Sequence, residues 1–397
     1  MPRLLHYLPL LALLALLALL TPPSVAAPFV PTSDAQVLQR VPARVGDPRV
    51  ADLQALRAAW RANPRDPALA VPLARRYVEE AAAEGDPRYV GYAQAALAPW
   101  WNEAAPPVAV RVQRAVLRQF GHQFAEALAD LDAAVLAEPG HAEAWSWLAA
   151  IHMVRADYAA AARACAGLAP LTSALLAAGC QASVDGLTGR ASVAAVALAV
   201  ALKSNPQASP EEQLWVQTRL AEVAERRGSL AVAERAFKDA LALGAPDVYV
   251  QAAYADFLLD NGRAPEVLTL LKDSARADVL LLRLALAAKA SGDARAAAWR
   301  RDLAARFAAA RARGDTTHEK EEARFSLELQ GDPVRALALA RSNYAVQREP
   351  ADARILLEAA IAAGQPAAAA PVHDWLATNR VESVLLRSLA AKLGGKP

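Results

Sequence analysis

Residues 142–165 read AEAWSWLAAIHMVRADYAAAARAC, and this stretch decides the fold. A first apolar run carries Trp145, Leu148 and Ala149, and a turn at Ala156-Asp157 leads into a second run that starts with Tyr158. Similar hairpin patterns return about every 34 residues along the chain. One helical hairpin cannot bury its apolar face alone, so repeated hairpins must stack on their neighbours. The sequence therefore predicts an all-α array.

The start of each repeat is set by the turn residue and by the Ala that follows it. The predicted first helices begin near Val108, Ala142, Leu175, Leu214, Val248, Asp278, Glu319 and Ala353. Glycines expected at turns inside the hairpins, where a positive φ is needed, are Gly189, Gly228, Gly262 and Gly292. Prolines expected after second helices, where they end a helix without breaking one, are Pro139, Pro206 and Pro350.

Two positions of the repeat differ in side-chain size, one holding small residues and the other large apolar ones. Position 20, where two helices are expected to cross closely, holds Ala127, Ala161, Ala194, Ala233, Val267, Ala297 and Ala338. Position 24 is larger and is expected to fill the space between layers, with Leu131, Leu198, Phe237 and Leu271. The alternative is an Ala-rich helical bundle without repeats, but the turn glycines and prolines in phase favour the array.

The pattern resembles the tetratricopeptide repeat (TPR) family, in which W-x2-L-G-x2-Y precedes A-x3-F-x2-A-x4-P. The third predicted repeat matches this pattern through Trp145, Leu148, Ala149, Tyr158 and Ala161, and the fifth through Leu220, Ala221, Gly228, Ala233, Phe237 and Ala240. The match is good over residues 108–271 and loose over 278–376. The resemblance implies an α-solenoid that forms a right-handed superhelix.

The N-terminus resembles a secretory signal. Arg3 precedes an apolar segment at 8–20, and Ser24-Val25-Ala26 forms a small-x-small site, so we expect cleavage after Ala26 and a periplasmic or secreted protein. The alternative is an uncleaved membrane anchor.

The expected organisation is a signal peptide (1–26), an extended lead-in (27–49), N-terminal helices with a degenerate repeat (50–107), TPR-like repeats (108–377) and a closing helix with a tail (378–397). Glu382, Arg387 and Lys392 are expected on the outer face of the closing helix, because a terminal repeat must present a polar surface to water.

Composition gives little reason to propose a charged polymer as partner. Without Arg3 the chain carries 42 Lys and Arg against 41 Asp and Glu. That balance disfavours nucleic acid and anionic membrane surfaces. After signal cleavage no segment is expected to span a membrane, because the apolar run at 193–202 is only ten residues long and suits a buried second helix.

The two cysteines, Cys165 and Cys180, fall on consecutive antiparallel helices in the repeat register. An oxidising compartment would favour a disulfide between them. The alternative is a pair of buried free thiols.

Catalytic motifs are mostly absent, so the chain is not expected to be an enzyme. It has no phosphate-binding glycine loop and no GxSxG or SxxK motif. His318-Glu319 starts like a zinc-protease helix, but Glu322 stands where a second histidine is required. No catalytic residue, cofactor or metal is therefore proposed.

The resemblance to TPR proteins implies that the first helix of each hairpin lines a concave groove. Carried over to this sequence, the groove positions include Met153, Trp215, Glu222, Tyr249 and Asp256. An aromatic pair flanked by acids suits a peptide of basic character. The alternative is that Trp215 and Tyr249 only fill the helix stack.

These features together predict an exported adaptor or scaffold that docks a protein or peptide partner in the bacterial cell envelope. Two other functions stay open. One is the helical part of a cell-wall-acting, transglycosylase-like enzyme, which needs a separate catalytic region. The other is a self-associating structural subunit.

Overall fold

The computed structural model describes residue 33 and residues 48–394, and the described part is helical throughout, without strands. The predicted signal segment and its cleavage site at Ala26 lie outside these residues. The helices are α2 Pro48–Ala62, α3 Pro67–Glu84, α4 Arg88–Ala96, α5 Val108–Phe120, α6 Phe124–Ala137, α7 Ala142–Val154, α8 Tyr158–Leu168, α9 Ala174–Asp185, α10 Ala191–Ser204, α11 Pro210–Arg226, α12 Leu230–Ala242, α13 Val248–Asp260, α14 Ala264–Leu270, α15 Asp278–Ser291, α16 Ala296–Ala312, α17 Glu319–Phe325, α18 Pro333–Val346, α19 Pro350–Ala362, α20 Ala370–Asn379 and α21 Val384–Lys392. Short 3₁₀ turns follow α4, α8 and α19, and a π-helical turn (Ser326–Gln330) extends α17.

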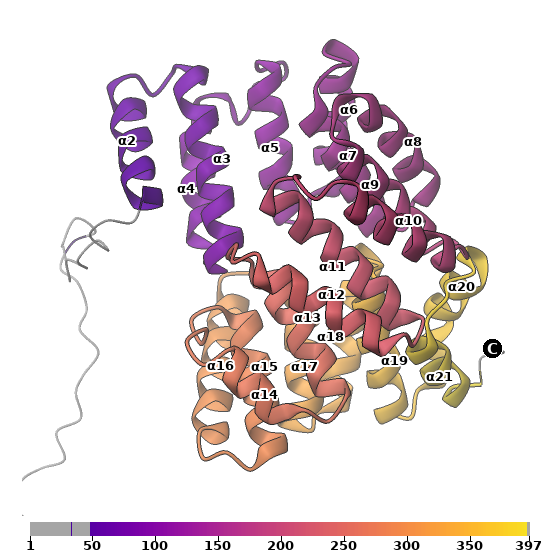
Figure 1. The fold of residues 1–397 in the computed structure, drawn as a ribbon. Coiled ribbons are helices and arrows are strands. Elements are labelled where there is room, and N and C mark those ends of the chain that lie inside the picture. The colour runs from indigo at the N-terminus through magenta and orange to yellow at the C-terminus, as the bar shows by residue number, and fades with distance from the viewer. Residues whose placement is uncertain (1–32, 34–47, 395–397) are drawn as a thin grey trace, which may run out of the picture. The chain divides into compact units, whose positions relative to one another are not determined.

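The chain divides into two units, residues 1–52 and Leu53–Pro397, and all the hairpins belong to the second. Within that unit consecutive helices pair as antiparallel hairpins, and the first helices of most successive hairpins pack on one another, as α9 does on α11 and α13 on α15. The turn at Ala156 has a φ of 60°, and Gly228 stands at 76°, a region that glycine adopts without strain. The fold is an all-α solenoid of TPR-like hairpins, as predicted (Figure 1).

The predicted register holds in the middle repeats. Ala127, Ala161, Ala194 and Ala233 at position 20 are completely buried, and so are the larger side chains at position 24. These small residues allow the close helix crossings that the pattern predicts. Upstream, α3 and α4 pack against each other, with Leu73, Ala74, Tyr77, Ala93 and Leu97 in their shared core.

The register is wrong for the second helices of the repeats that begin at Asp278 and Glu319. Ala297 and Ala338 are exposed instead of buried. In the middle repeats the residue at position 20 is the fourth of its second helix, whereas Ala297 is the second residue of α16 and falls outside the buried face that starts at Leu303. Ala338 is the sixth residue of α18, and the residues that bury are Ala336, which is the fourth, and Ala340.

The cysteine prediction is confirmed, and that of a buried helix at 193–202 is wrong. Cys165 of α8 and Cys180 of α9 form a disulfide with their Cα atoms 5.6 Å apart. By contrast, α10 buries only its alanine and leucine face, and it exposes Val193, Val196 and Val200. No helix among residues 48–394 is long and apolar enough to cross a bilayer.

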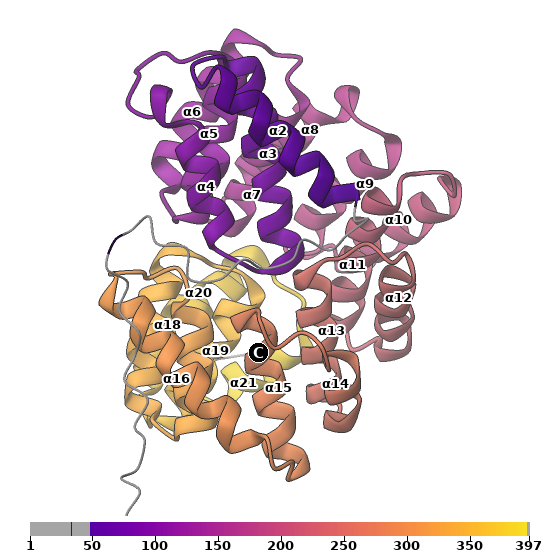
Figure 2. The same ribbon diagram turned by 90° about the vertical axis from the view of Figure 1, so that its left-hand side faces the viewer.

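The last helices return to the middle repeats, which repeat counting does not predict (Figure 1 and Figure 2). The backbone N–H of Arg348 donates to the carbonyl of Val154 at 2.8 Å. The indole N–H of Trp375 donates to the hydroxyl of Tyr158 at 3.0 Å in a buried site. Both contacts fall beside the α7–α8 turn, so the C-terminal hairpins pack along the edge that the hairpin turns form.

The closing helix is part of this contact. It spans Val384–Lys392, and Arg387 and Lys392 face solvent as expected. Glu382 was expected on the same polar face, and this is wrong. Its carboxylate accepts a hydrogen bond of 2.6 Å from the backbone N–H of Ala191. A carboxylate at the first N–H group of α10 satisfies an unpaired donor and the helix dipole together.

Candidate binding site on the inner helix faces

Helix α11 presents the first half of the candidate site. Ser209 caps its start through a reciprocal pair with Glu212. From there Trp215, Arg219, Glu222 and Arg226 recur at intervals of three or four residues and therefore share one helix face.

Trp215 serves the helix stack. A Cβ atom on Gly179 of α9 would overlap the Trp215 ring, so only glycine leaves room for the indole. The Trp215 side chain is half-buried against the core that α9 and α11 share. The alternative that Trp215 fills the stack is thus supported for this residue, while the Arg219 guanidinium stands 6.0 Å from the ring centre.

Tyr249 on α13 is placed differently, because 51% of its surface is accessible. Its hydroxyl donates to a Glu222 carboxylate oxygen at 2.5 Å. The Arg219 guanidinium stands 5.1 Å from the centre of the Tyr249 ring and 3.0 Å from Glu222. The surrounding protein and the Glu222 charge raise the pKa of the Tyr249 hydroxyl. Tyr249 is thus an accessible aromatic ring held in place by charged neighbours.

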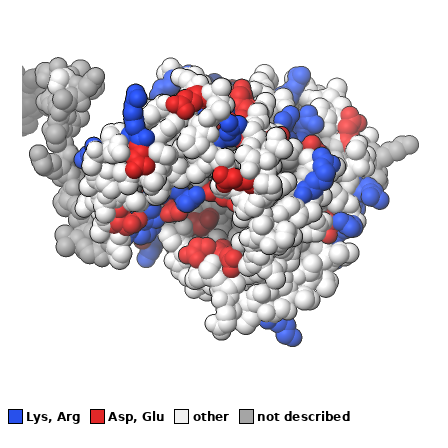
Figure 3. All heavy atoms as spheres, turned by 90° about the horizontal axis from the view of Figure 1, so that it is seen from above, with Lys and Arg blue, Asp and Glu red and all other residues white. Residues whose placement is uncertain are grey.

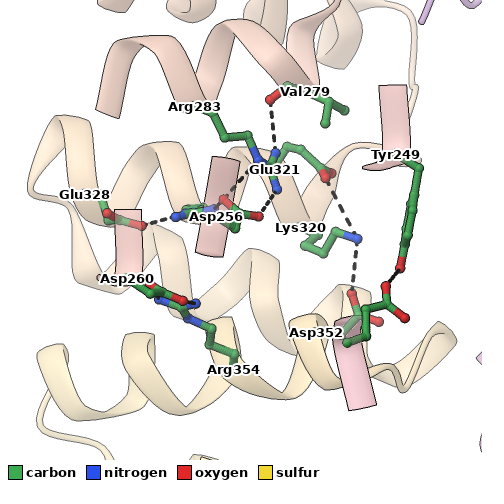
Figure 4. A network of polar contacts seen from close by, with 12 residues as sticks. Tyr249, Asp256, Asp260, Val279, Arg283, Lys320, Glu321, Glu328, Asp352 and Arg354 are labelled. Atoms are coloured by element: carbon green, nitrogen blue, oxygen red, sulfur yellow. Dashed lines mark hydrogen bonds and ion pairs between the residues drawn. The ribbon is translucent and has the colours of Figure 1, made fainter. Parts of the chain in front are cut away.

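Asp256, two helical turns further along α13, is fully occupied by two arginines (Figure 4). Arg283 of α15 reaches its carboxylate at 2.6 Å, and Arg324 of α17 reaches it at 2.5 Å. Burial opposes the negative charge, but the two guanidiniums outweigh it and hold the pKa of Asp256 well below its usual range. Asp256 is therefore a structural anion that joins three helices and has little charge left for a ligand.

The same network continues onto α17 and α19 (Figure 4). Lys320 lies between Glu321 at 3.8 Å and Asp352 at 3.9 Å, and chiefly the charge of Glu321 raises the pKa of the Lys320 ammonium. Arg354 reaches across to Asp260 at 2.5 Å, although 94 residues separate the two in the sequence. These pairs hold the returning C-terminal repeats against α13.

Glu225 is a strongly perturbed acid on this face. Burial raises its pKa to about 8, and the negative charges of Asp260 and Glu222 add to the effect. The neighbouring guanidinium of Arg226 is also penalised, since burial lowers its pKa, and its Nε has no hydrogen-bond partner among the described residues. Both groups bear a desolvation cost that a bound ligand of suitable charge could relieve.

We call this set of side chains the inner cluster. Within the described part of the chain we assign to it nine carboxylates and six bases, which are Glu222, Glu225, Asp256, Asp260, Glu321, Glu328, Glu349, Asp352 and Glu358 with Arg219, Arg226, Arg283, Lys320, Arg324 and Arg354. Figure 3 shows acidic and basic side chains around a hollow on one face of the molecule. Burial raises the pKa of Glu225, Glu349 and Glu358, so a bound cation would stabilise the ionised forms of these carboxyls. Across residues 48–394, no three His, Cys, Asp or Glu side chains are grouped to hold a metal ion.

The structure brings together four of the five groove residues expected from the sequence. Trp215, Glu222 and Tyr249 are neighbours around Arg219, and Asp256 belongs to the same network. Met153 lies apart, because it packs against the core that the C-terminal helices share with α7. The sequence analysis missed the six bases, although Arg219 lies one turn from both Trp215 and Glu222 and its spacing was visible.

No protein-family model matches the sequence, and no curated protein matches it. Among solved structures, PilW, a type IV pilus biogenesis factor, is 18% identical; the match covers 51% of this chain and 95% of PilW with a TM-score of 0.40. A TPR protein from Parabacteroides merdae is 14% identical over 72% of this chain and 98% of its own, with a TM-score of 0.33. Human IFIT1, solved with m7Gppp-AAAA, is 13% identical over 88% and 87%, with a TM-score of 0.45.

Paired helices, buried position-20 alanines and turn glycines at positive φ agree with one repeat type. The chain has an all-α solenoid fold of TPR-like hairpins. This TPR array differs from a simple open solenoid in one respect, namely the return of its last hairpins to the turn edge of the middle ones.

Proposed function

We propose that this protein is a non-enzymatic scaffold of the bacterial cell envelope that docks a protein or peptide segment on its inner cluster. The observation that carries the proposal is Tyr249, an accessible ring fixed by Glu222 and Arg219 among an excess of carboxylates. The preferred ligand is a segment with Lys or Arg side chains beside an apolar residue. Such a segment places its cations near Glu222 and Glu225 and its apolar side chain on the Tyr249 ring.

Export is part of the proposal. The Cys165–Cys180 disulfide supports it, because disulfides persist in oxidising compartments. The apolar segment at 8–20 with its site at Ala26 supports it independently.

The experiment that tests docking uses the full chain, tagged at its C-terminus and expressed in its native organism. After chemical crosslinking in the cell, proteins recovered with Tyr249→Ala are compared with those recovered with the wild type. Tyr92→Ala is the matched control, because Tyr92 on α4 is 46% exposed and stands outside the inner cluster. We expect the main partner to fall about tenfold with Tyr249→Ala, as for an aromatic hot spot, and to stay with Tyr92→Ala. Equal recovery with both variants contradicts the proposal.

A further inference from the structure

A second surface, on the outside of the repeats, has the composition of an interface. Twelve large apolar side chains are exposed in the described part of the chain, and seven of them lie on α10, α12 and α21. We call these seven the apolar patch: Val193, Val196, Val200, Leu230, Val232, Val384 and Leu385. Scattered single apolar residues need no explanation, but a concentration of this kind marks an interaction site.

Contacts at the helix starts join the three helices into one surface. Glu382 binds the first N–H of α10, two residues before Val193. Val384 lies beside Gly228, two residues before Leu230, with 3.5 Å from its Cγ2 to the point where a glycine Cβ would stand. The segment 382–385 therefore touches the starts of both α10 and α12, which are labelled with α21 in Figure 1. The exposed valines of α10 continue the patch along that helix for two further turns.

The patch is surrounded by positive charge. Residues 185–204, 227–242 and 380–392 together hold eight Lys and Arg against four Asp and Glu, in a chain whose net charge is only +2. Three of the four acids are occupied: Asp185 by Arg190, Glu234 by Arg263, and Glu382 by the α10 backbone. We call the exposed bases beside the patch the basic rim: Lys203, Arg227, Arg235, Arg380 and Arg387.

The charge and the side-chain types together favour one kind of occupant. A second copy of this chain, docked by two-fold symmetry, would place like-charged rims against one another. A membrane surface is usually met with Trp, Tyr or Phe, and the seven side chains of the apolar patch are all Val or Leu. A ridge of Val and Ala on an exposed helix instead suits the groove of another helix, as in every other layer of this fold.

We infer that the apolar patch docks an amphipathic helix of a partner protein whose apolar stripe is flanked by Asp and Glu. The helix lies against α10, adds one more layer to the outside of the array, and pairs its carboxylates with the basic rim. This surface is separate from the inner cluster, so it gives the scaffold a second place to hold a protein.

The test is photo-crosslinking in the native organism from benzoylphenylalanine placed at Val196 of the full chain. Val334 is the matched control, because it is a similarly exposed valine (66% against 64%) on α18, outside the patch. The crosslinked peptide is sequenced, synthesised and titrated against the purified protein. We expect a helical segment flanked by acids, which Lys203→Glu with Arg235→Glu binds about tenfold more weakly, and whose affinity falls as salt rises.

Four results overturn the inference: crosslinks to lipid, crosslinks to a second copy, crosslinks to a segment without flanking acids, or no excess of crosslinks over the Val334 control. The Tyr249→Ala variant distinguishes docking on the apolar patch from docking on the inner cluster. We expect this variant to leave the crosslink from position 196 unchanged.

Discussion

Glu225→Gln is expected to make the protein more stable at alkaline pH. The Glu225 carboxyl has its pKa raised to about 8, against 4.5 for the ordinary group, chiefly by burial. The folded state therefore keeps a proton that the unfolded state releases, and stability falls as pH rises through the window from about 4.5 to 8. If the whole pKa shift is converted into free energy of unfolding, it corresponds to about 5 kcal/mol. We expect a loss of roughly 3 kcal/mol, because the Glu225 side chain keeps partial contact with water.

The assay is urea unfolding of wild type and variant at pH 5 and pH 9, followed by circular dichroism. The two proteins should be nearly equal at pH 5, and Glu225→Gln should be more stable by roughly 3 kcal/mol at pH 9. Glu211→Gln is the control, since Glu211 lies exposed on the same helix, and its effect should stay below about 1 kcal/mol at either pH. Parallel loss of stability in wild type and Glu225→Gln would refute the assigned burial.

Three further predictions concern single contacts. Asp256→Asn leaves two inward-facing guanidiniums without their carboxylate and should cost about 3–5 kcal/mol at pH 7 by urea unfolding; an effect below about 1 kcal/mol would contradict the pairing. Replacing Cys165 and Cys180 by Ser should cost about 3 kcal/mol, measured against the oxidised wild type, and an unchanged midpoint would count against the crosslink. Gly179→Ala should cost about 1–3 kcal/mol because its Cβ meets the Trp215 ring, and a second variant, Gly179→Ala with Trp215→Leu, should recover part of the loss; no recovery would exclude that clash.

The fold was largely predictable because its signals are local. Helix starts such as Val108 and Val248 follow from turn residues and from a repeat of small and large side chains that each hairpin carries by itself. The predictions fail where a hairpin departs from the common spacing between its two helices, as at Ala338, which is the sixth residue of α18 and not the fourth. The contact between Trp375 and Tyr158 depends on the curvature of the whole array, which builds up from a small rotation between each pair of neighbouring repeats. No local sequence pattern predicts that accumulated rotation.

The inner cluster was predictable only in part for the same reason. The repeat pattern predicts which positions of each first helix face the groove, and these include Glu222 and Tyr249. In the structure the two side chains form a hydrogen bond. Arg324, which neutralises Asp256, comes from a helix 68 residues away, so the charge left at Asp256 could not be judged from α13 alone. The exposed valines of α10 were expected to be buried, because a strongly apolar helix is usually covered by a neighbour within its own chain.

The central claim is that partners dock on the inner cluster of a TPR array. Hydrogen exchange measured by mass spectrometry, on the protein alone and with its recovered main partner, tests this most directly. We expect slower exchange on α11, α13 and α19, which carry Glu222, Tyr249 and Asp352. Unchanged exchange on these three helices, with the partner bound at saturation, would contradict the claim.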